Sequence, residues 1–159
     1  MWPASPSISC TRMRTGPLRR LVAGALFLLL AGGSSLAGAS DLVVIVSARS
    51  QVSALRPDQV AAIFLGQSAR FPDGVEAVPL DLPLGSALRN EFYERVTNKT
   101  PALLKAHWSK MVFTGRGQPP GEVLDSAAVR RRVAENPELI GYIERGALDA
   151  SVRPVLMVR

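Results

Sequence analysis

An unbroken apolar run at residues 42–46, LVVIV, constrains the fold of this chain more than any other feature. A strand with one wet face alternates apolar and polar residues, whereas a run without alternation is typical of a strand covered on both faces. Other layers of the fold must therefore lie on both sides of the sheet that contains this run. Further strands are predicted at residues 75–82, 140–143 and 152–158.

Amphipathic helices are predicted between these strands. Pro57 suits the first turn of one helix, and Thr100 followed by Pro101 is a strong start signal, with a threonine N-cap and a proline at the first helical position. Strands that alternate with helices predict an α/β fold, here a single-lobe sandwich with a mixed sheet flanked by helices. The helices are expected at residues 53–65, at 85–96, from residue 100, and from a cap at Asp125 or Ser126.

The first 39 residues have the pattern of a secretory signal peptide. Arginines at 12, 14, 19 and 20 precede an apolar stretch at 21–30, and Ala-Gly-Ala at 37–39 offers the small residues of a cleavage site. The apolar stretch is shorter than the roughly 20 residues that span a bilayer. We therefore expect a leader at residues 1–39, a folded domain at residues 40–159, and a periplasmic location.

Composition limits the chemistry of the domain at residues 40–159. Cys10 is the one cysteine of the chain and lies in the leader, so neither a disulfide nor a thiol site is expected in the domain. Removing the leader removes arginines but no acidic residue, so the net charge of +6 falls. A weakly basic domain gives no argument for a nucleic-acid partner.

Two sequence blocks carry a family resemblance. They are VAAIFLGQSARFPDG at residues 60–74 and ENPELIGYIERGAL at residues 135–148, with GSALRNEF at 85–92 between them. In this order and spacing they resemble the second lobe of the type II periplasmic binding proteins, in their phosphate-binding branch. The resemblance implies a solute-binding protein of an ABC importer. Its ligand would be phosphate or a related oxyanion, and a membrane transporter or sensor would be its protein partner.

The sharpest candidate for a ligand site is the start of the helix at residues 85–96. Gly85 and Ser86 open this helix, and the backbone N–H groups of Ala87 and Leu88 point out of its positive end, which favours an oxyanion. Ser86 matches a ligand-binding serine of the family, and Ser86 and Arg89, one turn later, are expected to contact the anion. In the alternative interpretation Ser86 is only an N-cap. Leucines at positions 82 and 88, where the family has a ligand-binding arginine and threonine, weaken the match.

Three further residues are weaker candidates for a functional site. Ser47 would lie at the carboxyl end of the first strand, where α/β sheets bind ligands, although an ordinary polar loop explains it as well. His107 has no second histidine or cysteine with which to form a metal site, and Trp108 suits the core. We therefore expect no metal, no cofactor and no enzymatic activity.

A second functional hypothesis belongs to another class. One lobe would leave half of a ligand's hydrogen-bonding shell to water, and each charge-assisted bond contributes roughly 1.5–3 kcal/mol. The chain is therefore either a weak oxyanion binder or a ligand-free interaction module on the same fold. In the second case, the Gly- and Pro-rich loop at residues 114–121 is a candidate contact with a partner protein.

Overall fold

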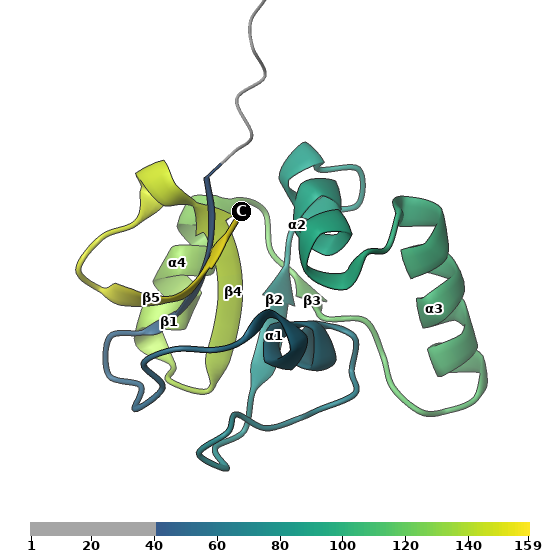
Figure 1. Cartoon of the computed structure of the whole chain (residues 1–159), viewed down its shortest axis with the longest axis horizontal. Coiled ribbons are helices and arrows are strands. Elements are labelled where there is room, and N and C mark those ends of the chain that lie inside the picture. Colours follow the sequence, from purple (N-terminus) through teal and green to yellow (C-terminus); the bar gives the residue numbers. More distant parts are fainter. Residues whose placement is uncertain (1–40) are drawn as a thin grey trace, which may run out of the picture. The chain divides into compact units, whose positions relative to one another are not determined.

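The computed structural model describes residues 41–159, so the predicted signal peptide at residues 1–39 lies outside the described residues. Strands and helices alternate along the chain (Figure 1), with a short 3₁₀ turn at Arg145–Ala147 before the last strand. In chain order the elements are β1 (Leu42–Ser47), α1 (Pro57–Phe64), β2 (Val78–Asp81), α2 (Ala87–Thr97), α3 (Pro101–Phe113), β3 (Gly121–Glu122), α4 (Ser126–Glu135), β4 (Leu139–Glu144) and β5 (Val152–Val158).

The five strands form one mixed sheet in the order β3-β2-β4-β1-β5. β1 is antiparallel to both of its neighbours, β4 and β5, whereas β2 is parallel to β3 and β4. The mixed sheet predicted from the sequence is therefore confirmed. Ile140 is level with both Val46 and Pro79, so the end of β1 and the beginning of β2 lie at the same edge of the sheet.

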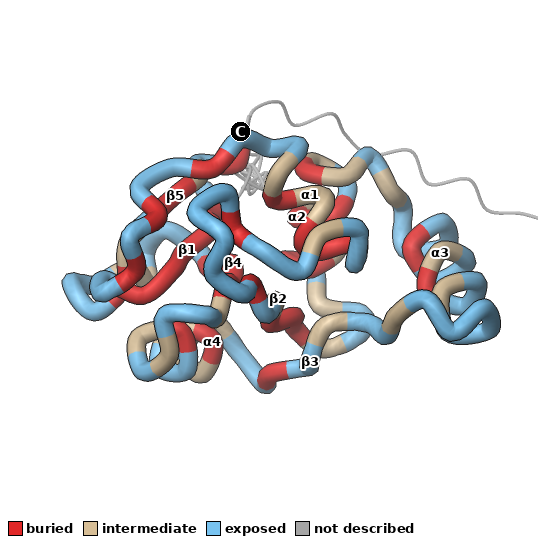
Figure 2. The backbone as a smooth tube through the Cα atoms, turned by 90° about the horizontal axis from the view of Figure 1, so that it is seen from below, coloured by how far each residue is buried: buried red, intermediate tan, exposed pale blue. Residues whose placement is uncertain are grey.

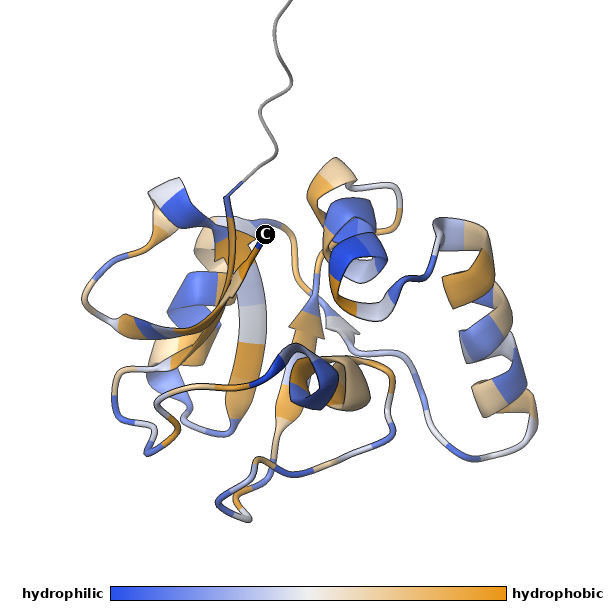
Figure 3. Cartoon of the chain, in the orientation of Figure 1, coloured by the Kyte–Doolittle hydropathy of each residue, from blue (hydrophilic) through white to orange (hydrophobic). Residues whose placement is uncertain are grey.

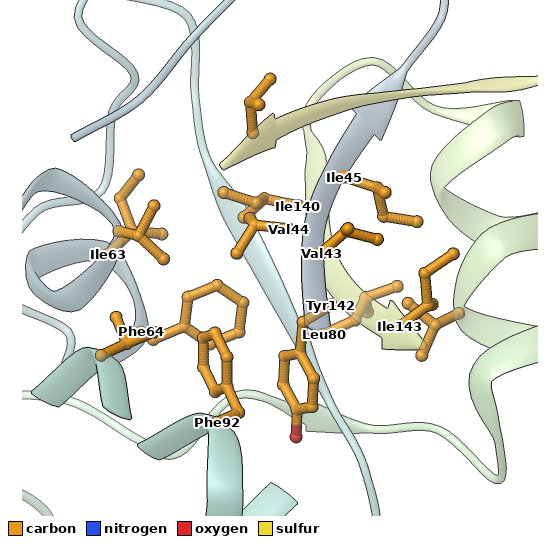
Figure 4. Packing of buried hydrophobic residues seen from close by; sticks show 14 of the residues in the cluster. Val43, Val44, Ile45, Ile63, Phe64, Leu80, Phe92, Ile140, Tyr142 and Ile143 are labelled. Atoms are coloured by element: carbon orange, nitrogen blue, oxygen red, sulfur yellow. The ribbon is translucent and has the colours of Figure 1, made fainter. Parts of the chain in front are cut away.

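Helices cover both faces of the sheet, as the apolar run of β1 predicts. All residues of β1 are buried. On one face α4 lies very close to β4, since a Cβ built on Gly141 would stand 2.4 Å from Cγ1 of Val129. Tyr142, the next residue, points to the opposite face and meets α1 and α2 (Figure 4). Neighbouring residues of one strand thus support both helical layers.

An aromatic cluster joins α1 and α2 to the sheet. The ring of Phe92 stacks on that of Tyr142, with centroids 3.9 Å apart and planes 6° apart. Phe64 meets Phe92 edge-on at 4.7 Å, and Tyr93 lies beside both phenylalanines. Such contacts fix the rotation of α2 about its axis, because aromatic pairs favour specific geometries over mere proximity. The first turn of α2 is thereby held in one orientation.

Among the helices, α3 makes the least contact with the sheet. Figure 2 shows that it is exposed over most of its length. Its side chains hold it to the end of α1. Nε2 of His107 lies 3.0 Å from the carbonyl oxygen of Leu65, and a Cβ on Gly66 would stand 3.2 Å from the indole of Trp108. His107 is therefore a structural residue that bridges two helices, as its isolation in the sequence indicates.

Three elements differ from the sequence-based expectation. The helix expected at residues 53–65 is shorter and runs from Pro57 to Phe64, with the proline at its first position. The strand expected at 75–82 is confined to Val78–Asp81, and its proline is tolerated because β3 pairs only with Leu80 and Asp81. The Gly- and Pro-rich loop ends in β3, a strand of two residues that the sequence did not predict.

Candidate functional site

The connection from β2 to α2 forms a tight turn with glycine at the position that needs it. Gly85 has φ +86°, a conformation that residues with a side chain rarely adopt. The N–H of Ser86 donates to the carbonyl oxygen of Pro83 at 3.1 Å, and this closes the turn just before α2 begins. The exposed side chain of Leu84, with 77% of its surface accessible, stands at the corner.

The first turn of α2 is capped by Ser86, and part of it remains open. Oγ of Ser86 accepts a hydrogen bond from the N–H of Arg89 at 3.4 Å, so the N-cap predicted as the alternative role is present. Within residues 41–159, the structure gives no acceptor for the N–H groups of Ala87 and Leu88. Two backbone donors at the positive end of a helix dipole are therefore available to an anion.

Asp81, the last residue of β2, organises a buried polar cluster beneath this turn. Its Oδ2 accepts hydrogen bonds from Nε of Arg89 at 2.8 Å and from the hydroxyl of Tyr93 at 2.9 Å. Its Oδ1 accepts the hydroxyl of Tyr142 at 2.5 Å and the N–H of Leu82 at 2.9 Å. The carboxylate is thus bonded on both oxygens, as burial of a charge requires.

The cluster changes the acidity of both tyrosines. Burial, followed by the negative charge of Asp81 and the hydrogen bond to it, raises the pKa of Tyr93 and of Tyr142 well above the ordinary value near 10. Both phenols therefore stay protonated and act as hydrogen-bond donors throughout the physiological range.

Arg89 is placed by this cluster. Its side chain is buried, with 7% of the residue exposed, and its guanidinium also lies 5.1 Å from the centre of the Tyr93 ring. Asp81 compensates its charge at close range, so Arg89 adds little net positive potential to the helix end. Sequence reasoning missed Asp81. The available signal was an acidic residue between two leucines, Leu80 and Leu82, in a predicted strand, because such a residue needs a partner when buried.

Ser47 lies elsewhere. Because β1 is antiparallel to β4, its carboxyl end is at the edge of the sheet where β2 begins, opposite to the turn at Ser86. The Ser47 hydroxyl is fully buried and donates to the carbonyl oxygen of Ala134 at 3.2 Å. Nearby Arg49 donates to carbonyl oxygens at the end of α4, those of Ala134 and Glu135. The structure therefore brings together Gly85, Ser86, Ala87, Leu88 and Arg89, and leaves Ser47 out.

A groove runs between the start of α2 and the length of α3. Its volume is about 780 Å³. Gly85 and Arg89 line one wall, and the facing wall is a stripe of α3 that includes Leu104, Trp108 and Val112. This volume falls in the range of about 300–1,000 Å³ that is usual for small-molecule sites. The groove lining includes Gly85 but not Ala87 or Leu88, so the open donors of α2 adjoin the groove in sequence without lining it.

Metal-binding clusters and membrane-spanning helices are absent from residues 41–159. This part of the chain contains no group of three or more His, Cys, Asp or Glu residues arranged to hold a metal ion. Its helices are all too short or too polar to span a bilayer.

Comparison with solved structures identifies the fold. A protein from Clostridium perfringens, described as a phosphate ABC transporter substrate-binding protein with bound phosphate, superposes with a TM-score of 0.58 at 23% identity. An ABC-type phosphate transport receptor from Vibrio cholerae gives 0.53 at 17%, and PstS from Borrelia burgdorferi gives 0.56 at 15%. Each match covers 73% of this chain.

Residues 41–159 therefore have the fold found in phosphate-binding transport proteins, and the resemblance in the sequence is confirmed at the level of fold. The chain spans less than half of those proteins, namely 44%, 45% and 46% of their lengths. Neither a family model nor a curated protein matches the sequence.

Proposed function

We propose that this chain is a periplasmic solute-binding-like protein that binds a small oxyanion, such as phosphate, at the start of α2. The observation that carries the proposal is the pair of open N–H groups at Ala87 and Leu88, on a fold shared with phosphate-binding transport proteins. The ligand would contact these donors and Gly85. Ser86 would cap the helix and present its hydroxyl, and Arg89 would hold the turn in place from below.

Binding at this site is expected to be weak, because few hydrogen-bond donors reach the ligand. Two backbone donors and one hydroxyl supply part of the shell that an oxyanion needs, and the nearest guanidinium is already paired with Asp81. At about 1.5–3 kcal/mol for each charge-assisted bond, the two backbone donors contribute about 3–6 kcal/mol, which corresponds to an affinity between millimolar and tens of micromolar. The role that fits this affinity is delivery or sensing of an abundant anion, with an ABC importer or a membrane sensor as the partner.

The test is calorimetric titration of the protein with phosphate, with sulfate as the comparison anion. Ser86→Asp keeps an efficient N-cap but places a negative charge at the site, so saturable binding should disappear. Thr100→Asp is the matched control, because Thr100 caps α3 in the same way. Saturation that survives Ser86→Asp, or the absence of saturation with both anions, would overturn the proposed function.

A further inference from the structure

The groove between α2 and α3 is more apolar than an inorganic anion requires. Leu84, Leu104, Trp108, Val112 and Phe113 line it, and 93% of the Phe113 surface is accessible. Figure 3 shows strongly hydrophobic segments on both α3 and the start of α2. Exposed apolar side chains that gather on one surface mark a binding site more often than isolated ones do.

The charged side chains on the α3 side of the groove are all basic. The chain from residue 96 to residue 121 contains Lys99, Lys105, Lys110 and Arg116 but no aspartate or glutamate. Lys105 lines the groove, and so does Gly85 at the positive end of α2. An occupant with a negative group therefore meets complementary charge at this surface, together with apolar walls.

Trp108 adds an independent observation. It is 7% exposed and forms part of the groove wall. Within residues 41–159, its indole N–H is the one buried side-chain polar atom without a hydrogen-bond partner. Buried polar groups are almost always paired, so this donor calls for a partner that the described residues do not supply.

We propose that this groove binds an organic anion with an apolar body, namely a phosphate monoester of a short alkyl or aryl group. The phosphate group lies between Gly85, at the positive end of α2, and Lys105, and the apolar group lies along Trp108, Val112 and Phe113. This inference rests on the proposed function, since it uses the same helix end. It names a phosphate monoester, in place of inorganic phosphate, as the ligand of this site.

The experiment compares ligands of increasing length. Inorganic phosphate, methyl phosphate, butyl phosphate and hexyl phosphate are titrated against the protein by calorimetry, with hexanol as the neutral probe. Each methylene buried in the groove should tighten binding by up to about fourfold, since its transfer from water is worth about 0.8 kcal/mol. Hexanol should bind far more weakly than hexyl phosphate.

Matched variants locate the site. Lys105→Glu should weaken the binding of hexyl phosphate by tenfold or more. Lys110→Glu, on the same helix but outside the groove lining, should leave this affinity unchanged. Phe113→Ser should weaken the binding of hexyl phosphate but leave the affinity for inorganic phosphate unchanged. Leu103→Ser is its control, because Leu103 is exposed on α3 but does not line the groove.

The outcomes separate the two proposals. If inorganic phosphate binds and hexyl phosphate binds no tighter, the ligand class is wrong while the oxyanion site stands. If hexanol binds as well as hexyl phosphate, or if both variants of a pair have equal effects, the inference is overturned. If no phosphate compound saturates, the proposed function fails as well.

Discussion

Replacement of Asp81 by asparagine would test the buried cluster beneath the start of α2. The change keeps the shape of the side chain and one acceptor oxygen, which can still serve the hydroxyl of Tyr142. It removes the charge that compensates Arg89, whose Nε lies 2.8 Å from the carboxylate while the residue is 7% exposed. An amide N–H₂ group cannot accept the hydrogen bond that Arg89 donates.

The expected loss follows from the burial of both partners. Removing one member of a buried ion pair costs about 3–5 kcal/mol, because the other charge stays desolvated without compensation. Domains of this size have a free energy of unfolding of about 5–15 kcal/mol, so Asp81→Asn removes a large share of it. With an m-value of about 1.5 kcal/mol per M, the urea midpoint falls by about 2–3 M.

Urea unfolding followed by circular dichroism measures this loss, and a double variant provides the critical comparison. Asp81→Asn combined with Arg89→Met removes the orphaned charge, so the double variant should be more stable than Asp81→Asn alone. The reasoning is refuted if Asp81→Asn costs less than about 1 kcal/mol, or if the double variant is no more stable than the single one.

Three further predictions concern the aromatic cluster, the sheet and α3. The raised pKa values of Tyr93 and Tyr142, the two tyrosines of the chain, mean that the folded state keeps two protons that the unfolded state loses above about pH 10. The contribution of the two tyrosines to the free energy of unfolding is therefore constant below that pH and falls by about 2.7 kcal/mol per pH unit above it. Tyrosinate absorbance should appear only together with unfolding. A tyrosine titration near pH 10 in the folded protein would contradict this prediction. Gly141→Ala places a methyl group 2.4 Å from Val129, which should lower the free energy of unfolding by about 1–3 kcal/mol in urea titration, and an unchanged midpoint would mean that α4 moves away freely. Thr100→Ala removes the cap of α3 and should lower the same free energy by about 1 kcal/mol, with a neutral result showing that α3 contributes little to the cooperative unit.

The ends of the helices were predictable because they depend on local chemistry. Thr100 caps α3 and Asp125 caps α4, as the sequence indicates. Pro57 begins α1, and β5 occupies the predicted residues 152–158. Each of these signals is encoded within a few neighbouring residues, so it can be read without knowledge of the rest of the fold.

The composition of the site was less predictable, because it depends on pairings between distant residues. Strand direction leaves no trace in hydrophobic periodicity, so the sequence could not show that β1 runs opposite to β4 and takes Ser47 away from Ser86. Likewise, the pairing of Arg89 with Asp81 spans a strand, a turn and a helix. Gly85, Ser86 and the first residues of α2 were found together because they are consecutive.

The position of β1 in the sheet has a consequence for how the chain folds. The first strand lies between the last two, so both of its partners are on the order of 100 residues away in the sequence. Loops of that length must close before the LVVIV run gains its hydrogen bonds, and such topologies fold slowly. A newly made chain therefore carries an unpaired, strongly apolar strand until β4 and β5 have been made. During this interval, association with other unfinished chains competes directly with completion of the sheet.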